Sequence, residues 1–319
     1  MTPPVSTGTS TSAPVTFVIP VFNGASFLPM ALESLLAQSR GDWRAILIDD
    51  GSSDGSRRII DACTDPRMLK LRNEGNRGLY ASLIRAIAHA DTPWISILMQ
   101  DDRLHADYLD HMSDVVPKYP EAGAIWSAHH VIDERGHIFK EGASSGRTEL
   151  ITPGVEPWLS ALHRGCFWII SGSFTRRELL ETLPFRADLP HCGDYEWLLR
   201  SLRCAVFLYY EMPLLDIREH PSQASTANLH TAVDIPESYR VIEDTIARHP
   251  GDITLRRRSS GGLAAVSTGG PQEPRRECAR PLGACGLARH LGHTFPPAST
   301  ADAGRRIIAS GRGLAAVDR

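Results

Sequence analysis

Residues 15–55 read VTFVIPVFNGASFLPMALESLLAQSRGDWRAILIDDGSSDG. The stretch begins with a short apolar run over Val15–Ile19, which predicts a buried strand that ends at Pro20. Apolar residues at helical spacing then predict a helix over Ala25–Gln38, and a second apolar run predicts a strand over Trp43–Ile48. Strand, helix and strand in this order are typical of the start of a parallel sheet.

The same alternation continues to residue 102. The pattern predicts helices over Ser56–Ala62 and Asn76–Ala90, and strands over Met68–Leu71 and Trp94–Met99. This rhythm indicates an α/β fold with a mostly parallel central sheet and helices on both faces. Ligands bind such sheets outside the carboxyl ends of the strands, near the point where the strand order reverses.

Two acidic pairs follow strands of the predicted sheet. Asp49 and Asp50 open the turn after the second strand, and Asp101 and Asp102 follow the apolar segment WISILM. The first pair suits hydrogen bonding to a nucleoside, or an ordinary turn in which Asp54 caps the next helix. The second pair needs a counter-charge, which Mg²⁺ or Mn²⁺ would supply because both prefer oxygen ligands. The alternative is a helix-entry turn.

The chain after residue 102 is less regular. Apolar runs predict strands over Ala124–Ala128 and Val206–Tyr210, and turn residues predict a hairpin around Asp133–Gly136. A helix is predicted over Asp194–Cys204.

Two further motifs in this part carry chemistry. Asp194 opens the apolar helix in HCGDYEWLLR, where it suits either an N-cap or a base at the mouth of a site. Arg218 and His220 form an RxH motif that suits phosphate binding or a metal shell, or else simple surface exposure.

Composition sets the class of protein. The 319 residues are 42% hydrophobic and 22% charged with a net charge of −3, which is typical of a globular protein and argues against a nucleic-acid partner. The six cysteines form no CxxC pair, which favours free thiols in a reducing cytosol. No apolar run approaches the roughly 20 residues that cross a bilayer. The pattern therefore indicates a soluble protein, at most peripheral to a membrane.

The composition along the chain predicts three regions. Residues 1–14 lack the basic and apolar segments of a secretory signal and are expected to form a disordered leader. Residues 15–251 form one domain, with a nucleotide-binding half over 15–102 and an acceptor half over 103–251. Residues 252–319 are rich in Arg, Gly, Ala, Pro and Ser, which predicts a low-complexity, disordered tail, although an out-of-frame reading of a GC-rich gene would give the same texture.

Five segments in order carry a resemblance to a known family. They are VTFVIPVFNGASFLPMALESLLAQ, AILIDDGSSDGS, NEGNRGLYASLIRAI, WISILMQDD and HCGDYEWLLR, and together they resemble glycosyltransferase family 2 over about Val15–His220. Members of that family are inverting enzymes with the GT-A fold. The resemblance implies transfer of a sugar from a UDP- or dTDP-sugar to a hydroxyl of a glycan or lipid-linked acceptor, in cell-surface polysaccharide synthesis. It also implies a cytoplasmic site, peripheral to the inner face of the membrane.

The resemblance also implies roles for single residues. Asp194 would be the catalytic base, and Asp102, assisted by His220, would bind Mg²⁺ or Mn²⁺ on the donor diphosphate. Arg218 would contact the diphosphate. The nucleotide site would be made by Pro20, Phe22, Asp50 and Asp101.

The chain departs from the family pattern at two positions, and two other functions compete. Gln100 stands where the family often has Asp, and Gly193 stands where it often has Glu. A sugar-nucleotidyltransferase would share the sheet and the metal, but the segment from Pro20 to Ser39 carries none of the basic residues that hold a triphosphate. A non-catalytic nucleotide-sugar-binding homologue is the other alternative, and Asp102 together with Asp194 weighs against it.

Overall fold

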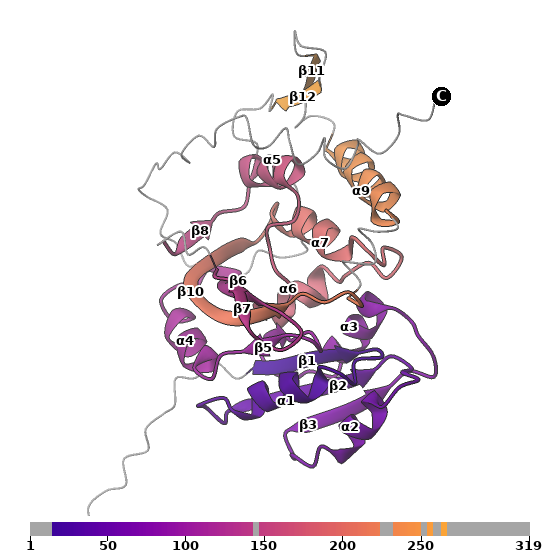
Figure 1. Ribbon diagram of the computed structural model, residues 1–319. Coiled ribbons are helices and arrows are strands. Elements are labelled where there is room, and N and C mark those ends of the chain that lie inside the picture. The colour runs from indigo at the N-terminus through magenta and orange to yellow at the C-terminus, as the bar shows by residue number, and fades with distance from the viewer. Residues whose placement is uncertain (1–14, 143–146, 224–231, 250–253, 258–262, 267–319) are drawn as a thin grey trace, which may run out of the picture.

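The computed structural model describes residues 15–142, 147–223, 232–249, 254–257 and 263–266. The first half alternates strands and helices in the predicted order (Figure 1). Its elements are β1 (Val15–Val21), α1 (Leu28–Leu36), β2 (Trp43–Asp49), α2 (Ser56–Ala62), β3 (Met68–Arg72), α3 (Leu79–Ile87) and β4 (Trp94–Ile97).

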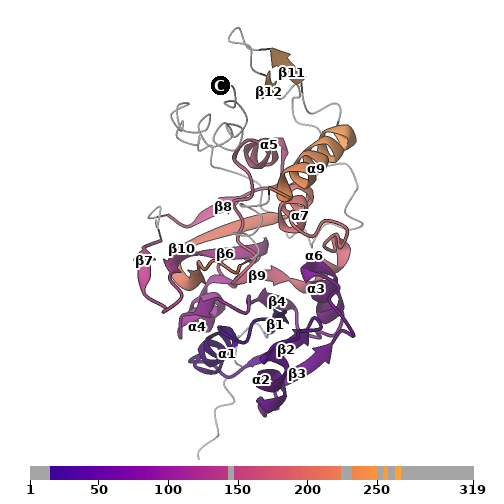
Figure 2. The ribbon, with the colours of Figure 1, turned by 45° about the vertical axis from the view of Figure 1, so that its right-hand side comes forward.

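The second half adds further strands to the same sheet and further helices that pack on its faces. Its elements are β5 (Arg103–Leu104), α4 (Tyr108–Val115), β6 (Ala122–Ile132), β7 (Ile138–Lys140), β8 (Glu149–Ile151), α5 (Val155–Arg164), β9 (Ser173–Arg176), α6 (Arg177–Thr182), α7 (Gly193–Ser201), β10 (Val206–Arg218) and α9 (Asp234–Arg248). Figures 1 and 2 place α5, α7 and α9 together at the end of the molecule away from β3 and α2.

The central sheet has the strand order β3-β2-β1-β4-β9-β6-β10-β5. Neighbours from β3 to β4 are parallel, and β10 is parallel to β6. Because β9 is antiparallel to both β4 and β6, it is reversed between strands that all run the same way, and β5 is reversed at the edge. The predicted α/β fold with a mostly parallel sheet is therefore confirmed, with two antiparallel insertions on the main path.

Two hydrophobic cores cover the two faces of this sheet. Along β1, Val15, Phe17, Ile19 and Val21 face one core while Val18 faces the other, as the two-residue period of a strand requires. The first core also contains the apolar faces of α1 and α4, and the second contains those of α3, α5, α6 and α7. Helices thus bury both faces and leave the ends of the strands for function.

The strand order reverses at β1. The chain runs outward from β1 through β2 to β3 and then returns to place β4 on the other side of β1. A crevice outside the carboxyl ends of β1 and β4 is therefore the expected ligand site for this topology. Phe22 and Gln100 lie at these two ends.

Several boundaries differ from the sequence predictions. Strand β10 has 13 residues and irregularities around Pro213, whereas the pattern predicted only Val206–Tyr210. The hairpin around Asp133–Gly136 is present, since β6 and β7 pair across it. Within 252–319 the structure describes β11 (Thr254–Arg257) paired with β12 (Leu263–Val266), which the prediction of a disordered tail did not include. The rest of that segment and residues 1–14 lie outside the described residues.

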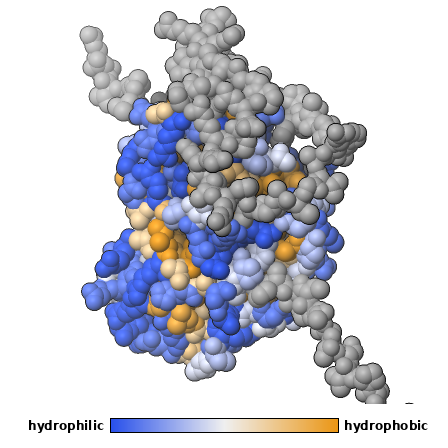
Figure 3. Space-filling model, turned by 180° about the vertical axis from the view of Figure 1, so that it is seen from behind, coloured by the Kyte–Doolittle hydropathy of each residue, from blue (hydrophilic) through white to orange (hydrophobic). Residues whose placement is uncertain are grey.

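The surface is mostly polar, and the cysteines differ in their oxidation state. Figure 3 shows a mostly hydrophilic face on which apolar side chains gather in a few patches. Among the described helices, none combines the length and apolar character that a bilayer span requires. Cys63, Cys166 and Cys192 are free, as predicted, whereas Cys204 is disulfide-bonded.

Candidate active site at the carboxyl edge of the sheet

The loops after β1 and β2 are joined by hydrogen bonds. Asn23, in the left-handed region at φ 49°, uses its Oδ1 to accept the backbone N–H of Ser53 at 2.8 Å. Asp54 was predicted to cap α2. The N-cap position is Gly55, but Asp54 Oδ1 accepts the N–H of Ser56, the first residue of the helix, at 2.9 Å. Its Oδ2 accepts the N–H of Ala25 at 3.0 Å, so Asp54 also joins one loop to the other. The rim of the site is thus rigidly built.

Asp50 holds the loop after β3. It is buried, and its Oδ1 accepts the side-chain amide of Asn73 at 2.6 Å and the N–H of Arg77 at 2.9 Å. Its Oδ2 accepts the N–H of Gly78 at 2.9 Å. Because a carboxylate oxygen can accept two hydrogen bonds, Oδ2 retains the capacity to accept one more.

Gln100 bridges the two strand ends at the reversal point. Its Oε1 accepts the backbone N–H of Phe22 at 2.9 Å, and its Nε2 donates to the carbonyl of the same residue at 3.1 Å. Only an amide offers both a donor and an acceptor here, whereas an ionised Asp could only accept. A Cβ atom at Gly24 would lie 2.1 Å from Gln100 Oε1, so the bridge also requires glycine. Gln100 therefore stands where the family often has Asp because its amide both accepts from and donates to the backbone of Phe22. Phe22 is 41% exposed beside it, and Pro20 is buried in β1.

The second acidic pair meets the RxH motif, which lies more than a hundred residues later in the chain. The imidazole Nε2 of His220 lies 3.1 Å from Asp101 Oδ2, and the backbone N–H of Arg218 donates to Asp102 Oδ1 at 2.9 Å. Asp102 is buried, and burial, reinforced by the neighbouring charge of Asp101, raises its pKa. The structure thus brings four of the predicted site residues together.

Arg218 lies inside the protein. It is 1% exposed, and its guanidinium donates to the backbone carbonyls of Asp101 at 2.9 Å and Asp133 at 2.5 Å. The guanidinium carbon also lies 4.9 Å from the ring centre of Phe27. These contacts fix the loop that carries the acidic pair, and they direct the side chain toward protein groups.

The acidic pair fits a hard divalent cation. Asp101 and Asp102 supply carboxylate oxygens, the donors that Mg²⁺ and Mn²⁺ prefer, and His220 adds an imidazole beside them. Burial and the charge of Asp101 raise the pKa of Asp102, and the positive charge of Arg218 offsets these two effects only in part. A cation at this position would relieve the repulsion between the two carboxylates.

Asp194 is partly buried in the first turn of α7. The helix begins at Gly193 with Cys192 as N-cap, so the reading of Asp194 as an N-cap is wrong. The hydroxyl of Tyr80, from α3, donates to Asp194 Oδ1 at 3.2 Å and accepts the backbone N–H of Asp194 at 3.0 Å. Burial raises the pKa of Asp194, although hydrogen bonds from Tyr195 and Tyr80 act in the opposite direction.

Gly193 makes this contact possible. A Cβ atom at Gly193 would lie 2.5 Å from the ring of Tyr80, so no larger residue fits while Tyr80 keeps its place. Gly193 stands where the family often has Glu because the ring of Tyr80 occupies the space that a side chain would need. Sequence reasoning missed Tyr80, because it lies 114 residues before Asp194.

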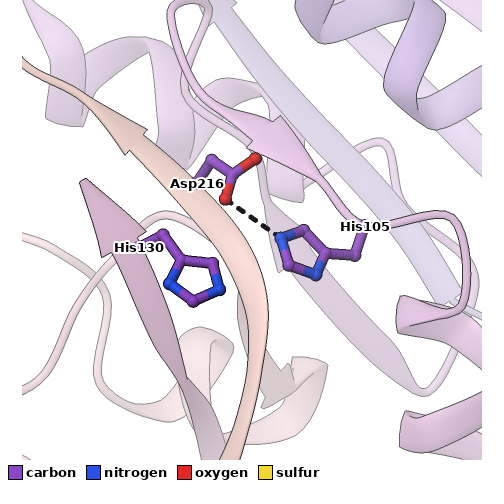
Figure 4. A group of neighbouring side chains, drawn as sticks. All are labelled: His105, His130 and Asp216. Carbon is purple, nitrogen blue, oxygen red and sulfur yellow. Dashed lines mark hydrogen bonds and ion pairs between the residues drawn. The ribbon is translucent and has the colours of Figure 1, made fainter. Parts of the chain in front are cut away.

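Sequence reasoning also missed a polar group beside the acidic loop. His105, His130 and Asp216 come from the end of β5, from β6 and from β10, and a ligand atom of each lies within 4.8 Å of the others (Figure 4). His105 Nε2 lies 3.0 Å from Asp216 Oδ1, and Arg103 donates to Asp216 Oδ2 at 2.8 Å. Burial alone would raise the pKa of Asp216, but the hydrogen bonds from His105 and Arg103 lower it.

This group could hold a metal only by rearranging. Its two imidazoles and one carboxylate suit zinc better than Mg²⁺ or Mn²⁺. However, His130 Nδ1 accepts the backbone N–H of Gly142 at 3.1 Å, so Nε2 carries the proton in the neutral ring. A ligating imidazole needs the opposite arrangement, in which the second nitrogen donates. The described group is therefore a hydrogen-bonded network that ties β5 to β10.

We expect Asp216→Asn to destabilise the protein by about 1.5–3 kcal/mol, because it leaves the cationic Arg103 without a carboxylate partner in a largely buried network. Urea unfolding measures the change. Asp91→Asn is the matched control, since its pair with Arg44 is exposed on both sides and should matter by less than about 1 kcal/mol. Equal effects of the two substitutions would contradict the role of the buried network.

Comparison with known proteins identifies the family of this chain. The model of the family described as "Glycosyl transferase family 2" matches residues 16–183. An uncharacterized glycosyltransferase of Rickettsia bellii is 24% identical over 66% of this chain and 30% of its own length. The succinoglycan biosynthesis protein ExoO of Rhizobium meliloti is 34% identical over 60% of this chain and 56% of its own. The chain spans only about a third of the first curated relatives that it matches.

A solved structure shares the fold. The crystal structure of S. aureus TarS 1–349 in complex with UDP-GlcNAc superposes with a TM-score of 0.58 at 14% identity, covering 73% of this chain and 66% of that one. At this identity the likeness concerns the fold, which is that of a GT-A glycosyltransferase.

Proposed function

This chain belongs to glycosyl transferase family 2, and from that premise we propose that it transfers a sugar, with inversion, from a UDP- or dTDP-sugar to a hydroxyl of a glycan or lipid-linked acceptor. The observation that carries the proposal is the meeting of Asp101 and Asp102 with Arg218 and His220 beside the strand-order reversal. Two similar proteins, the succinoglycan biosynthesis protein ExoO and TarS in its complex with UDP-GlcNAc, support a role in cell-surface polysaccharide synthesis. A lipid-linked acceptor would place the reaction at the cytoplasmic face of the membrane.

The nucleotide would bind at the edge of the sheet from β2 to β4. Phe22 borders the base with its exposed ring, and Pro20 shapes the end of the strand below it. Asp50 accepts an N–H of the base at Oδ2, the oxygen that accepts only one hydrogen bond from the loop after β3. Asp101 contacts the nucleoside, and its hydrogen bond to His220 orients the carboxylate.

The diphosphate part of the proposal uses Asp102 and His220. A bound Mg²⁺ or Mn²⁺ would neutralise charge on the leaving diphosphate, an effect worth several kcal/mol. Asp102 would hold that cation with its carboxylate. His220 would complete the shell only by exchanging one of its two hydrogen bonds, to Asp101 Oδ2 or to Ser222 Oγ, for the metal. We reassign Arg218 from contacting the diphosphate to positioning, because its guanidinium donates to Asp101 and Asp133 carbonyls.

Asp194 is the proposed base. It accepts the proton of the acceptor hydroxyl as that oxygen attacks the anomeric carbon, and the sugar leaves the nucleoside diphosphate in the same displacement. A partly buried carboxylate with a raised pKa is a stronger base than a fully solvated one, which suits this step. Tyr80 orients it through a hydroxyl that both donates and accepts.

A panel of UDP- and dTDP-sugars with Mg²⁺ and Mn²⁺ tests the proposal. We expect at least one donor to release its nucleoside diphosphate in a metal-dependent reaction, and thermal shift to show binding of the same nucleotide. Binding without release from any donor would support a non-catalytic binding homologue instead.

We expect Tyr80→Phe to shift the acid limb of the pH profile of kcat to higher pH. The lost hydroxyl stabilised the ionised form of Asp194, so its removal raises the pKa of that base further, and a base must be deprotonated to act. Tyr108→Phe is the matched control, because it removes another buried hydroxyl, hydrogen-bonded to Ser96 and Gly172, away from Asp194. An unchanged profile for Tyr80→Phe would show that Tyr80 only supports the fold.

A further inference from the structure

Helix α9 packs beside α7, the helix whose first turn carries the proposed base (Figures 1 and 2). Val241 of α9 is 1% exposed and belongs to the core that also contains the apolar face of α7, so both helices are part of one domain. The helix lies outside residues 16–183, which the family model matches, and beyond His220, where the resemblance in sequence ends. The contribution of α9 to the site therefore has to be derived from its own contacts.

A row of polar side chains on α9 reaches the segment that leads into α7. Their spacing of three or four residues puts them on one side of the helix. Three of them form ion pairs, which are Arg240 with Asp188 at 2.9 Å, Asp244 with Arg186 at 3.5 Å, and Arg248 with Glu196 at 3.7 Å. Because at least one side chain of each pair is partly exposed, each pair contributes little to stability. No single pair of this row fixes the segment.

Glu237, in the first turn of α9, binds the backbone of the same segment. Its Oε1 accepts the N–H of His191 at 2.9 Å and that of Cys192 at 2.6 Å. Cys192 is the N-cap of α7, and in a capping box the N–H of the N-cap is accepted by a glutamate at the third position of the same helix. In α7 that position is Tyr195. Glu237 therefore supplies, from another helix, the carboxylate that α7 itself lacks.

The backbone is held in this way on both sides of Gly193. The Tyr80 hydroxyl accepts the N–H of Asp194 at 3.0 Å, and Glu237 holds the two N–H groups before the glycine. A glycine restricts its own backbone less than any other residue, because it has no Cβ atom. The two anchors, one from α3 and one from α9, therefore determine where the carboxylate of Asp194 lies.

Glu237 also brings a charge close to Asp194. The pKa of Asp194 is raised by desolvation and, in addition, by the negative charge of Glu237. The other titratable groups that interact with this carboxylate are the Tyr80 hydroxyl and the thiols of Cys166 and Cys192. Desolvation raises the pKa of all three, that of Cys192 to about 11. Since those three groups stay neutral near neutral pH, they cannot mask the effect of the Glu237 charge.

We propose that Glu237 is a positioning residue for the transfer reaction, which anchors the backbone before α7 through two N–H groups and so fixes the place of the Asp194 carboxylate. The inference rests on the proposed function and adds to its site a residue from α9. Glu237 acts through Asp194, so its loss should affect kcat and leave the KM of the donor unchanged.

Glu237→Gln separates the charge from the anchor. The amide oxygen can still accept both N–H groups, so the melting temperature should stay the same. Loss of the negative charge lowers the pKa of Asp194, and a base acts in its deprotonated form. The acid limb of the pH profile of kcat should therefore move to lower pH, opposite to the shift expected for Tyr80→Phe. The measurement uses the full chain with Mg²⁺ or Mn²⁺ and the UDP- or dTDP-sugar that it turns over.

Glu237→Ala removes the anchor as well. We expect kcat to fall by about tenfold or more with the KM of the donor unchanged, because a displacement of about 1 Å can cost up to about 10² in rate. Glu243→Ala is the matched control, since it removes an exposed carboxylate from the same helix and should change neither constant. Melting temperatures identify a variant that fails to fold, and Glu237→Gln keeps the inference testable in that case.

The outcomes separate this inference from the proposed function. An unchanged pH profile of Glu237→Gln, or a kcat of folded Glu237→Ala equal to that of Glu243→Ala, would refute the positioning role. The proposed function would stand as long as the unchanged protein turns over a donor and Asp194→Asn does not. Absence of turnover by the unchanged protein with every donor would instead refute the proposed function.

Discussion

Asp194→Asn lowers the rate of sugar transfer by about 10²–10⁴-fold if Asp194 is the general base, because an amide cannot accept the proton of the acceptor hydroxyl. Donor binding should survive, since the proposed base acts on the acceptor hydroxyl and its hydrogen bonds go to Tyr80 and Tyr195, not to the acidic pair. The melting temperature should change little. Asn keeps the shape and the oxygen that accepts from Tyr80 and Tyr195, and Asp194 is not the N-cap of α7. Transfer rate, donor Kd and melting temperature on one variant measure all three.

Asp188→Asn is the matched control for this experiment. Asp188 lies five residues before α7 and pairs with Arg186 and Arg240 on the surface, so its loss should leave transfer intact. Transfer by Asp194→Asn at the rate of the unchanged protein would remove the catalytic role. A parallel loss of donor binding would show that the residue belongs to the donor site.

Asp102→Asn should abolish the stabilisation that UDP and Mn²⁺ together give the protein. A ligand present at a hundred times its Kd adds about 2.7 kcal/mol of stability, and the variant loses the carboxylate that holds the cation. The fold should remain, because Asn keeps an oxygen for the backbone N–H of Arg218.

The metal-free variant should be as stable as the unchanged protein or more so. Burial and the charge of Asp101 raise the folded-state pKa of Asp102 above its unfolded value. The ionised carboxylate therefore costs stability, and that cost grows as the pH rises from the unfolded pKa through the folded one. Asn removes the cost at neutral pH.

Melting temperatures with and without UDP and Mn²⁺ measure both effects. Asp114→Asn, on the exposed side of α4, is the matched control and should respond to the ligands as the unchanged protein does. A metal-dependent shift that persists in Asp102→Asn would place the cation elsewhere. The group formed by His105, His130 and Asp216 would be the next place to examine.

The fold of the first half was predictable because its signals are local. The apolar runs of β1, β2 and β4 and the helical spacing in α1 and α3 each lie within a few residues, and the alternation itself implies the parallel sheet. The same logic put the first acidic pair at the end of β2, whereas the second pair lies in the turn between β4 and β5, because β4 ends at Ile97 and not at Met99. It did not predict the reversed strand β9 between β4 and β6, because insertion of a strand depends on pairing between distant segments.

The candidate site was predictable only in its parts. The residue types of Asp102, Asp194 and His220 suggested chemistry, but no spacing relates Asp101 to His220, which lie 119 residues apart and meet through the pairing of β10 with β5. That Gln100 bridges two strand ends and that Gly193 makes room for Tyr80 could be seen only in the structure. A lone amide or glycine carries no signal of the group it will contact.

The stereochemistry of donor hydrolysis tests the central claim most directly. Proton NMR follows the anomeric signals when the protein, Mg²⁺ and the α-linked UDP- or dTDP-sugar that it turns over are mixed without an acceptor, so that water attacks in place of the acceptor hydroxyl. We expect the β-anomer of the free sugar to appear first, before it equilibrates in water, and Asp194→Asn to suppress it. Initial release of the α-anomer, or hydrolysis that is equally fast in Asp194→Asn, would contradict a single displacement assisted by Asp194.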